Sequence, residues 1–315
     1  MNLSEVHARR QPGRHPVGMA AVLLPFEENG EIAEEAYVSC LQDTIQAGLI
    51  PAVNMDTGYV NLLTDAEKAR VLGIVREALG PTGTPFVAGA FIEGQDGDVV
   101  DNYRREIARI AEHGGTPILF QTSRLHNLPP GAVVEAYDRA TRDVPAAYAF
   151  ELGKMFAPNG EIWETRVFEG ILGIGQIKGA KHSSLDRVIE LERLETRDRI
   201  RPEFHVFTGN DLGIDMIEYG SDYLLGLAAF SPAKFAERDR LWAAQDPAYL
   251  MVADALQWLG NIAFRPPVPA YKHSAATFLH LLGKIPTSKT HPRSPERPAW
   301  EREILSDCAR RLLLI

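Results

Sequence analysis

The chain has 315 residues, of which 45% are hydrophobic and 24% are charged, so it can bury one barrel-sized core or two smaller ones. Acidic residues outnumber basic ones by 42 to 33, and the net charge of −9 argues against a nucleic-acid or anionic-membrane partner. Two cysteines provide no disulfide framework, and no stretch approaches the roughly 18 apolar residues of a membrane span. These features predict a cytoplasmic protein.

The first predicted elements are a tail, a strand and a helix. Residues 1–16 are polar and basic, without an apolar core, which predicts a flexible N-terminal tail. Residues 18–26 form a short apolar run typical of a strand. Residues 32–45 then carry apolar side chains at helical spacing, and Gly48 ends that helix.

The same strand and helix pattern repeats along the chain. Residues 49–55 read as a strand, and Thr64 with Glu67 forms a capping box for a helix that ends at Gly80. Six more strands, each followed by a helix-compatible segment, are predicted at residues 85–91, 116–121, 144–152, 170–178, 203–209 and 221–230. Eight such units within residues 17–245 predict an α/β fold, the (β/α)8 TIM barrel.

Residues 246–315 contain no strand candidate and predict a helical C-terminal extension packed on the barrel. Its helices are expected at residues 249–262, 274–282 and 300–314. The alternative to a barrel is a doubly wound open sheet, which is expected to carry a glycine-rich phosphate loop after its first strand. The residues that follow 18–26 lack such a loop.

Lys178 ends the predicted strand 170–178, and the carboxyl ends of barrel strands meet at one mouth. Strand alternation places Lys178 on the same face as Gln176. If that face is the barrel interior, poor hydration lowers the pKa of Lys178, and its neutral amine can attack a carbonyl to form a Schiff base. The alternative is that the Lys178 side chain extends into solvent.

Lys181 lies in the turn before a helix start, so we expect its side chain to reach solvent or to line the mouth.

Other polar residues follow strands. Tyr148 lies near the end of the fifth predicted strand and could relay a proton to the substrate oxygen, or be a core tyrosine. The turn containing Asp56, Thr57 and Gly58 could bind a carboxylate through backbone N–H groups, or be a tight turn in which Gly58 has positive φ. Residues 209–211 could bind ligand or cap a helix. The nine histidines are scattered, which predicts no metal site.

Six short motifs follow one another in a recognisable order. They are Leu24-Pro25-Phe26 with Asn29-Gly30, Asp56-Thr57-Gly58 with Leu63-Thr64 and Glu67, Ile177-Lys178 with Asp186-Arg187-Val188, Thr208-Gly209-Asn210-Asp211, residues 220–232, and residues 271–283. Over nearly the whole chain, this order resembles the dihydrodipicolinate synthase and N-acetylneuraminate lyase family of class I aldolases.

The resemblance implies a Schiff-base lysine at Lys178, a proton-shuttling hydroxyl at Tyr148, and no cofactor beyond the covalent lysine. Asp56 is a further candidate acid or base. The predicted substrate-binding residues are Thr57, Gly58, Tyr59, Glu151, Gly209 and Asp211. Members of the family commonly form homodimers or homotetramers, and their usual partner is pyruvate or another 2-oxo acid.

The chain also departs from the family pattern. Asp56 replaces the first threonine of a Thr-Thr pair, and Tyr59 replaces a glutamate. A tyrosine that some members contribute across the subunit interface has no match in residues 121–126. The family's Asn-x-Pro is replaced by residues 149–151, and the arginine of dipicolinate-forming members is absent, which disfavours lysine biosynthesis.

Three functions are consistent with these residues. The first is a carbon–carbon lyase or aldolase that forms a Schiff base with a 2-oxo acid or related ketone. The second is a dehydratase that uses the same iminium, because both reactions need the same electron sink. The third is a non-catalytic barrel that binds a sugar acid. Side-chain identity alone does not name the substrate or the oligomeric state.

Overall fold

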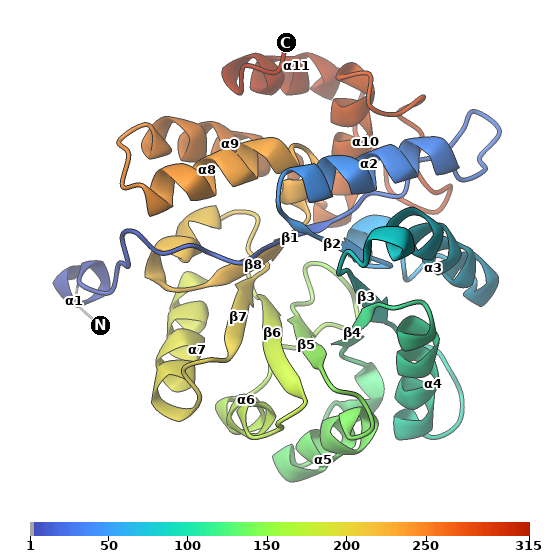
Figure 1. Cartoon of the computed structure of the whole chain (residues 1–315), viewed down its shortest axis with the longest axis vertical. Coiled ribbons are helices and arrows are strands. Elements are labelled where there is room, and N and C mark those ends of the chain that lie inside the picture. The colour runs from blue at the N-terminus through green and yellow to red at the C-terminus, as the bar shows by residue number, and fades with distance from the viewer. Residues whose placement is uncertain (1–2) are drawn as a thin grey trace.

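A computed structural model describes residues 3–315 of the chain. Its eight parallel strands close into a barrel in which each strand pairs with the next in chain order (Figure 1). The strands are β1 (Gly18–Ala21), β2 (Ile50–Val53), β3 (Val87–Ala90), β4 (Thr116–Phe120), β5 (Ala147–Leu152), β6 (Ile177–Ser183), β7 (His205–Thr208) and β8 (Asp222–Leu225). The closed parallel barrel confirms the predicted fold class.

Helices surround the barrel and connect its strands (Figure 1). They are α2 (Glu34–Gln46), α3 (Asp65–Leu79), α4 (Val99–Glu112), α5 (Pro130–Thr141), α6 (Thr165–Leu172), α7 (Arg187–Ile200) and α8 (Pro232–Ala243). The predicted capping box is present at α3, where Thr64 and Glu67 bond to each other's backbone N–H groups. The connection after β7 differs from the expected pattern, because it contains the 3-10 helix η4 (Ile214–Tyr219).

Three helices form the C-terminal part of the molecule. They are α9 (Tyr249–Ala263), α10 (Tyr271–Leu281) and α11 (Glu301–Arg311), close to the three predicted ranges. Helix α9 packs against α8, and α10 and α11 pack on each other (Figure 1). The first residues of α10 reach the loop that follows β2, which brings distant parts of the sequence to one place.

The predicted strand at residues 170–178 is wrong, because α6 occupies its first part and β6 begins at Ile177. Val167, Phe168, Ile171 and Leu172 are buried along one face of α6, which is a helical spacing. A register shift follows, since Ala147 pairs with Ile177 whereas Tyr148 pairs with Gly179. The residue left over at this bulge is Lys178.

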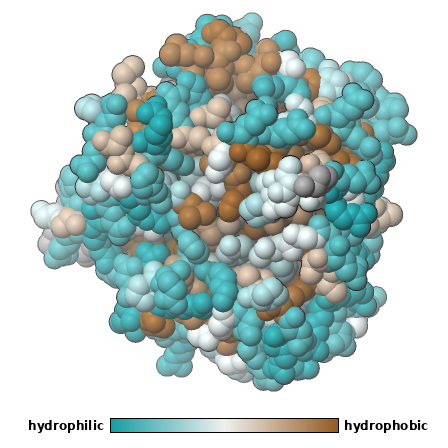
Figure 2. All heavy atoms as spheres, viewed as in Figure 1, coloured by the Kyte–Doolittle hydropathy of each residue, from teal (hydrophilic) through white to brown (hydrophobic). Residues whose placement is uncertain are grey.

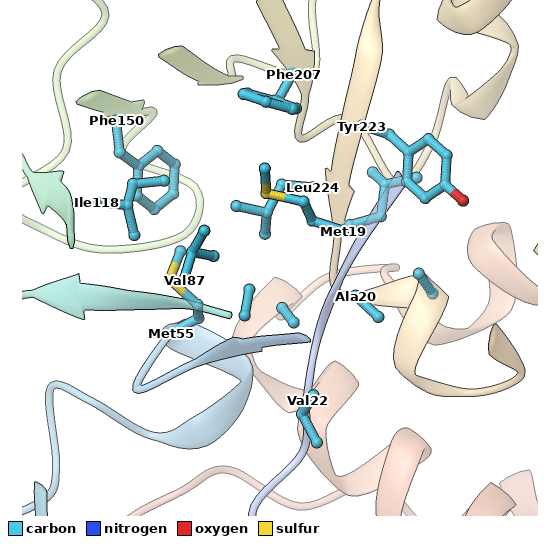
Figure 3. Packing of buried hydrophobic residues seen from close by; sticks show 14 of the residues in the cluster. Met19, Ala20, Val22, Met55, Val87, Ile118, Phe150, Phe207, Tyr223 and Leu224 are labelled. Atoms are coloured by element: carbon cyan, nitrogen blue, oxygen red, sulfur yellow. The ribbon is translucent and has the colours of Figure 1, made fainter. Parts of the chain in front are cut away.

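Apolar side chains fill the barrel below its mouth. Met19, Val87, Ile118, Phe207 and Leu224 are buried and converge within the ring of strands (Figure 3). Gly179 makes room for this packing, because a Cβ there would lie 2.8 Å from the Phe207 ring. The interior is therefore a packed core, which leaves the carboxyl ends of the strands as the place for polar chemistry.

Part of the segment predicted as a flexible tail lies against the barrel. Residues 1–2 are outside the described residues, and α1 spans Leu3–His7. The backbone N–H of Gln11 donates to the Glu218 carbonyl at 2.7 Å, and Arg14 pairs with Asp222 at 2.5 Å. Asp222 is the first residue of β8, so this segment crosses the amino ends of the strands, opposite the mouth.

The visible surface is mainly hydrophilic, with apolar side chains gathered near the C-terminal end (Figure 2). Large exposed apolar residues include Leu250 and Met251 on α9, and Leu313 and Ile315 beyond α11. Homo-oligomer formation remains a prediction. Across residues 3–315, no helix is both long and apolar enough to span a membrane.

Candidate active site

Lys181 lies inside the barrel, near the carboxyl end of β6. It pairs in register with Phe150 on β5 and Phe207 on β7, and the residue is only 8% exposed. Its ammonium group lies 4.4 Å from the centroid of the Phe150 ring. Burial lowers the pKa of Lys181 to about 8, although the charges of Asp211 and Asp56 oppose this shift. The expectation that Lys181 reaches solvent is therefore wrong.

Asp211, which follows β7, is a buried acid whose charge acts on Lys181. Burial raises the pKa of Asp211 to about 7, while the N–H of Leu227 and the charge of Lys181 act in the opposite direction. The Leu227 N–H donates to Asp211 Oδ1 at 2.7 Å, which fixes the carboxyl group. Burial thus shifts the pKa of Lys181 down and that of Asp211 up, both toward neutral pH, which is uncommon for structural residues.

The loop after β2 presents Asp56 and Thr57 to the first residues of α10. Tyr271 Oη donates to Asp56 Oδ2 at 2.9 Å and lies 2.8 Å from Thr57 Oγ1. Lys272 Nζ lies 3.1 Å from both Asp56 carboxylate oxygens, and the side chain of Lys272 is 3% exposed. Lys272 therefore neutralises the Asp56 carboxylate, which stands where the family that the sequence resembles has a threonine.

Two contacts hold the Tyr271 ring in this position. Phe264 stacks on it with a centroid separation of 4.3 Å and an interplanar angle of 17°. Gly226, after β8, allows the approach, because a Cβ at that residue would lie 3.0 Å from the Tyr271 ring and 3.2 Å from Thr57 Oγ1. The local sequence thus permits a tyrosine from the C-terminal helix to reach the strand ends.

Lys178 lies at the other end of β6, where the strand begins. Its Nζ donates to the carbonyl of Gly175 at 2.6 Å, in the loop before the strand. Strand alternation and the adjacent bulge also separate it from the interior face that carries Lys181. The structure does not bring Lys178 together with Asp56; the lysine that lies on the interior face near the mouth is Lys181.

Tyr148 lies on the interior face but deeper in the barrel than Lys181. It pairs with Gly179, and its ring meets Phe207 edge-on with centroids 5.4 Å apart. Burial raises the pKa of Tyr148, and the charge of Asp222, at the amino end of β8, adds to that effect. The residue beside Lys181 on β5 is Phe150, which has no hydroxyl group.

The remaining predicted residues of the mouth have mainly structural contacts. Tyr59, not Gly58, adopts positive φ, at 60°, and its ring is buried against Phe26. Gly209 provides space, because a Cβ there would lie 1.9 Å from Ser183 Oγ and 2.7 Å from Lys181 Cε. Ser183 Oγ is buried and has no hydrogen-bond partner within residues 3–315.

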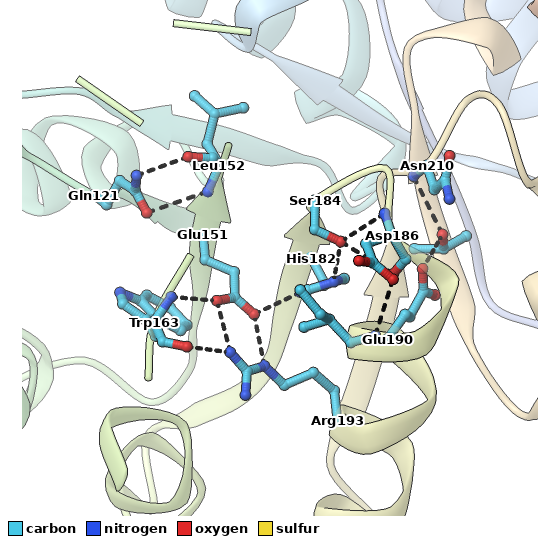
Figure 4. A network of polar contacts seen from close by, with 12 residues as sticks. Gln121, Glu151, Leu152, Trp163, His182, Ser184, Asp186, Glu190, Arg193 and Asn210 are labelled. Carbon is cyan, nitrogen blue, oxygen red and sulfur yellow. Dashed lines mark hydrogen bonds and ion pairs between the residues drawn. The ribbon is translucent and has the colours of Figure 1, made fainter. Parts of the chain in front are cut away.

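Glu151 points outward from the barrel into a buried network of charges (Figure 4). It accepts hydrogen bonds from His182 Nδ1 at 2.6 Å, from Arg193 Nε at 3.0 Å and from the backbone N–H of Trp163 at 2.8 Å. Burial acts to raise the pKa of Glu151, but His182 and Arg193 outweigh it and hold the pKa below its usual range. Both carboxylate oxygens are occupied, which leaves none free for a substrate.

Ser184, His182 and Glu151 follow one another in the order of a serine-hydrolase triad. His182 Nε2 lies 2.6 Å from Ser184 Oγ. The serine is only 7% exposed, and its Oγ also accepts from the Asp186 N–H at 3.0 Å. This is the hydrogen bonding of a turn at the start of α7, so we interpret the chain of three residues as structural.

The buried lysine gives a prediction for stability. Because folding lowers the pKa of Lys181, the folded state binds that proton less tightly than the unfolded state does. Folding is therefore less favourable wherever the lysine is protonated in both states, and this loss of stability is fully present below pH 8. We expect Lys181→Met to raise the free energy of unfolding at pH 7 by about 1–3 kcal/mol, measured by urea denaturation. A less stable variant would contradict this account of the site.

Within residues 3–315, no three His, Cys, Asp or Glu side chains are grouped so that they could hold a metal ion. The candidate site is therefore built from Lys181, Asp211, Asp56, Thr57, Tyr271 and Lys272. Sequence reasoning proposed three of these residues for the site. It did not assign Tyr271 or Lys272 to it, since they lie more than 200 residues from the loop they contact.

Comparison with known proteins identifies the fold. No family model matches the chain, and no curated protein sequence matches it. Dihydrodipicolinate synthase from Thermotoga maritima is 16% identical, with a TM-score of 0.80 over 96% of this chain and 100% of that one.

Two similar structures contain pyruvate. YagE, a prophage protein of the dihydrodipicolinic acid synthase family from E. coli K12, is 13% identical, with a TM-score of 0.81 over 95% of this chain and 99% of that one. Dihydrodipicolinate synthase from Acinetobacter baumannii is 16% identical, with a TM-score of 0.78 over 96% of this chain and 100% of that one. The chain has the fold of these structures, as the resemblance predicted.

Proposed function

We propose that this chain is a carbon–carbon lyase of the class I aldolase type, with Lys181 as its Schiff-base nucleophile. The observation that carries the proposal is a buried lysine with a pKa of about 8 at the carboxyl ends of the barrel strands. The fold shared with two structures that contain pyruvate supports a 2-oxo acid or related ketone as the substrate.

The residues around Lys181 supply what the first step requires. The neutral amine attacks the carbonyl carbon, and loss of water from the carbinolamine leaves a protonated iminium. Asp211 titrates near pH 7, so its carboxyl form can give a proton to the departing hydroxyl group, and its carboxylate then stabilises the iminium charge. Lys272, paired with Asp56, is the second cation of this site.

Adduct formation should depend on pH through Lys181. Because only the neutral amine attacks, we expect the rate to rise about tenfold per pH unit at acidic pH. The rate should stop rising between pH 7 and 8, because Asp211 then loses the proton that it gives to the departing hydroxyl group. An ordinary lysine would continue to gain reactivity to pH 10 or higher. Trapping with cyanoborohydride between pH 5.5 and 10 measures this profile.

Asp211→Asn tests the interaction between Asp211 and Lys181 that contributes to that profile. The charge of Asp211 raises the pKa of Lys181, so its removal should move the midpoint of the profile to lower pH. A midpoint that stays in place, or moves to higher pH, would contradict the assigned interaction.

The function itself is tested by incubating the protein with pyruvate, other 2-oxo acids and 4-hydroxy-2-oxo acids, with and without borohydride. We expect irreversible inactivation only when borohydride and a reactive carbonyl compound are both present. Release of an aldehyde identifies the lyase, whereas release of water with retention of the carbon chain identifies a dehydratase. Thermal stabilisation by a sugar acid without adduct or turnover would favour a non-catalytic barrel.

A further inference from the structure

The proposed reaction needs a hydroxyl or acid that moves protons at the substrate oxygen, and β5 does not provide one beside Lys181. The side chain in register with Lys181 on that strand is Phe150, while Tyr148 lies one layer deeper, against Phe207. General acid–base catalysis requires the proton carrier to lie within hydrogen-bond reach of the reacting atoms.

Tyr271 brings a hydroxyl group to the carboxyl ends of the strands from the C-terminal helix α10. Its Oη contacts both Thr57 Oγ1 and Asp56 Oδ2, and its ring is held by the stacked Phe264. The same two carboxylates, Asp56 and Asp211, act electrostatically on Tyr271 and on Lys181, so the phenol and the amine share one environment.

We propose that Tyr271 and Asp56 form the proton relay of this active site, with Tyr271 as the group that contacts the substrate oxygen. This inference rests on the proposed function. It deepens that function by assigning the acid–base step to a residue of the C-terminal extension.

The relay moves a proton without forming a free phenolate. In carbon–carbon cleavage, the substrate O–H bond breaks, its proton goes to Tyr271 Oη, and the phenol proton goes to Asp56 Oδ2. The electron pair left on oxygen forms the new carbonyl π bond, the C–C pair forms the enamine C=C bond, and the C=N π pair moves to the nitrogen of Lys181.

Charge and burial favour this concerted path. Burial, together with the charge of Asp56, raises the pKa of Tyr271 well above its usual value, so the phenol does not ionise alone. Asp56 is a carboxylate paired with Lys272 at 3.1 Å and accepts the Tyr271 hydrogen bond at 2.9 Å before any reaction begins. The pair is thus arranged to transfer a proton in either direction.

The test compares Tyr271→Phe with Tyr249→Phe. Tyr249 is also a buried tyrosine of the C-terminal extension whose hydroxyl donates to a carboxylate, Glu218, at 2.9 Å, but it lies away from the Lys181 site. The trapping probe is pyruvate, or the carbonyl compound that is trapped fastest on the wild-type protein, and turnover is measured as aldehyde release from a 4-hydroxy-2-oxo acid. We expect Tyr271→Phe to lower turnover about 100-fold or more while Lys181 is still trapped, and Tyr249→Phe to remain within about twofold of wild type.

Turnover of Tyr271→Phe close to that of Tyr249→Phe would overturn the relay and leave the Schiff-base function intact. Absence of any adduct on the wild-type protein would instead overturn the function on which the relay rests. If Tyr271→Phe does not fold, Thr57→Val keeps the ring but removes its hydroxyl partner, and we expect turnover about tenfold lower. Unchanged turnover in Thr57→Val would then count against the relay.

Discussion

Replacing Lys181 with methionine is expected to lower turnover by about 1,000-fold or more and to abolish the borohydride-trapped adduct. Methionine matches the unbranched four-atom stem of lysine but has no amine to form the iminium. Since we also expect this variant to be more stable than wild type, loss of activity will not be a result of unfolding.

Lys178→Met is the matched control, because it makes the same substitution on the same strand. Lys178 contacts the Gly175 carbonyl at the amino end of β6, far along the strand from the residues of the mouth. We expect its turnover to stay within about twofold of wild type. The opposite pattern, with activity lost in Lys178→Met and kept in Lys181→Met, would restore the position first expected from the sequence.

Replacing Arg193 with methionine is expected to lower the free energy of unfolding by about 3–5 kcal/mol. The substitution would remove two hydrogen bonds to Glu151, at 3.0 and 3.2 Å, and leave a carboxylate with no exposed surface beside His182. Breaking one partner of a buried ion pair is costly because the remaining charge stays desolvated. Urea denaturation at pH 7 measures the change.

Arg199→Met tests the same substitution on the same helix, at an exposed ion pair with Glu169. We expect it to change the free energy of unfolding by no more than about 1 kcal/mol.

Adding Glu151→Gln to Arg193→Met should recover part of the lost stability, since it removes the unpaired charge. A raised KM for Glu151→Gln, with stability unchanged, would instead show that Glu151 binds substrate.

Much of the fold could be predicted from the sequence, because its signals are local and repeated. Apolar runs followed by helical spacing mark each unit, and the capping box at Thr64 and Glu67 forms as predicted. The error at residues 170–178 has a physical cause. A short apolar run fits both a strand and a buried helix. Here Ile171 and Leu172 belong to helix α6, which buries their side chains.

The site was less predictable than the fold for two reasons. The bulge at Lys178 shifts the pairing between β5 and β6, and no sequence pattern fixes such a shift. Tyr271 and Lys272 reach Asp56 only through packing of the C-terminal helices on the barrel. Asp56 itself could be identified as unusual, but the cation that pairs with it could not.

The most direct measurement of the central claim is peptide mapping of the wild-type protein after borohydride treatment with pyruvate or with the carbonyl compound trapped fastest. Trypsin does not cleave after a modified lysine, so an adduct on Lys181 appears in the peptide 179–187, which contains a missed cleavage. We predict that result. An adduct in the peptide 167–181, with cleavage missed at Lys178 and normal at Lys181, would contradict the account.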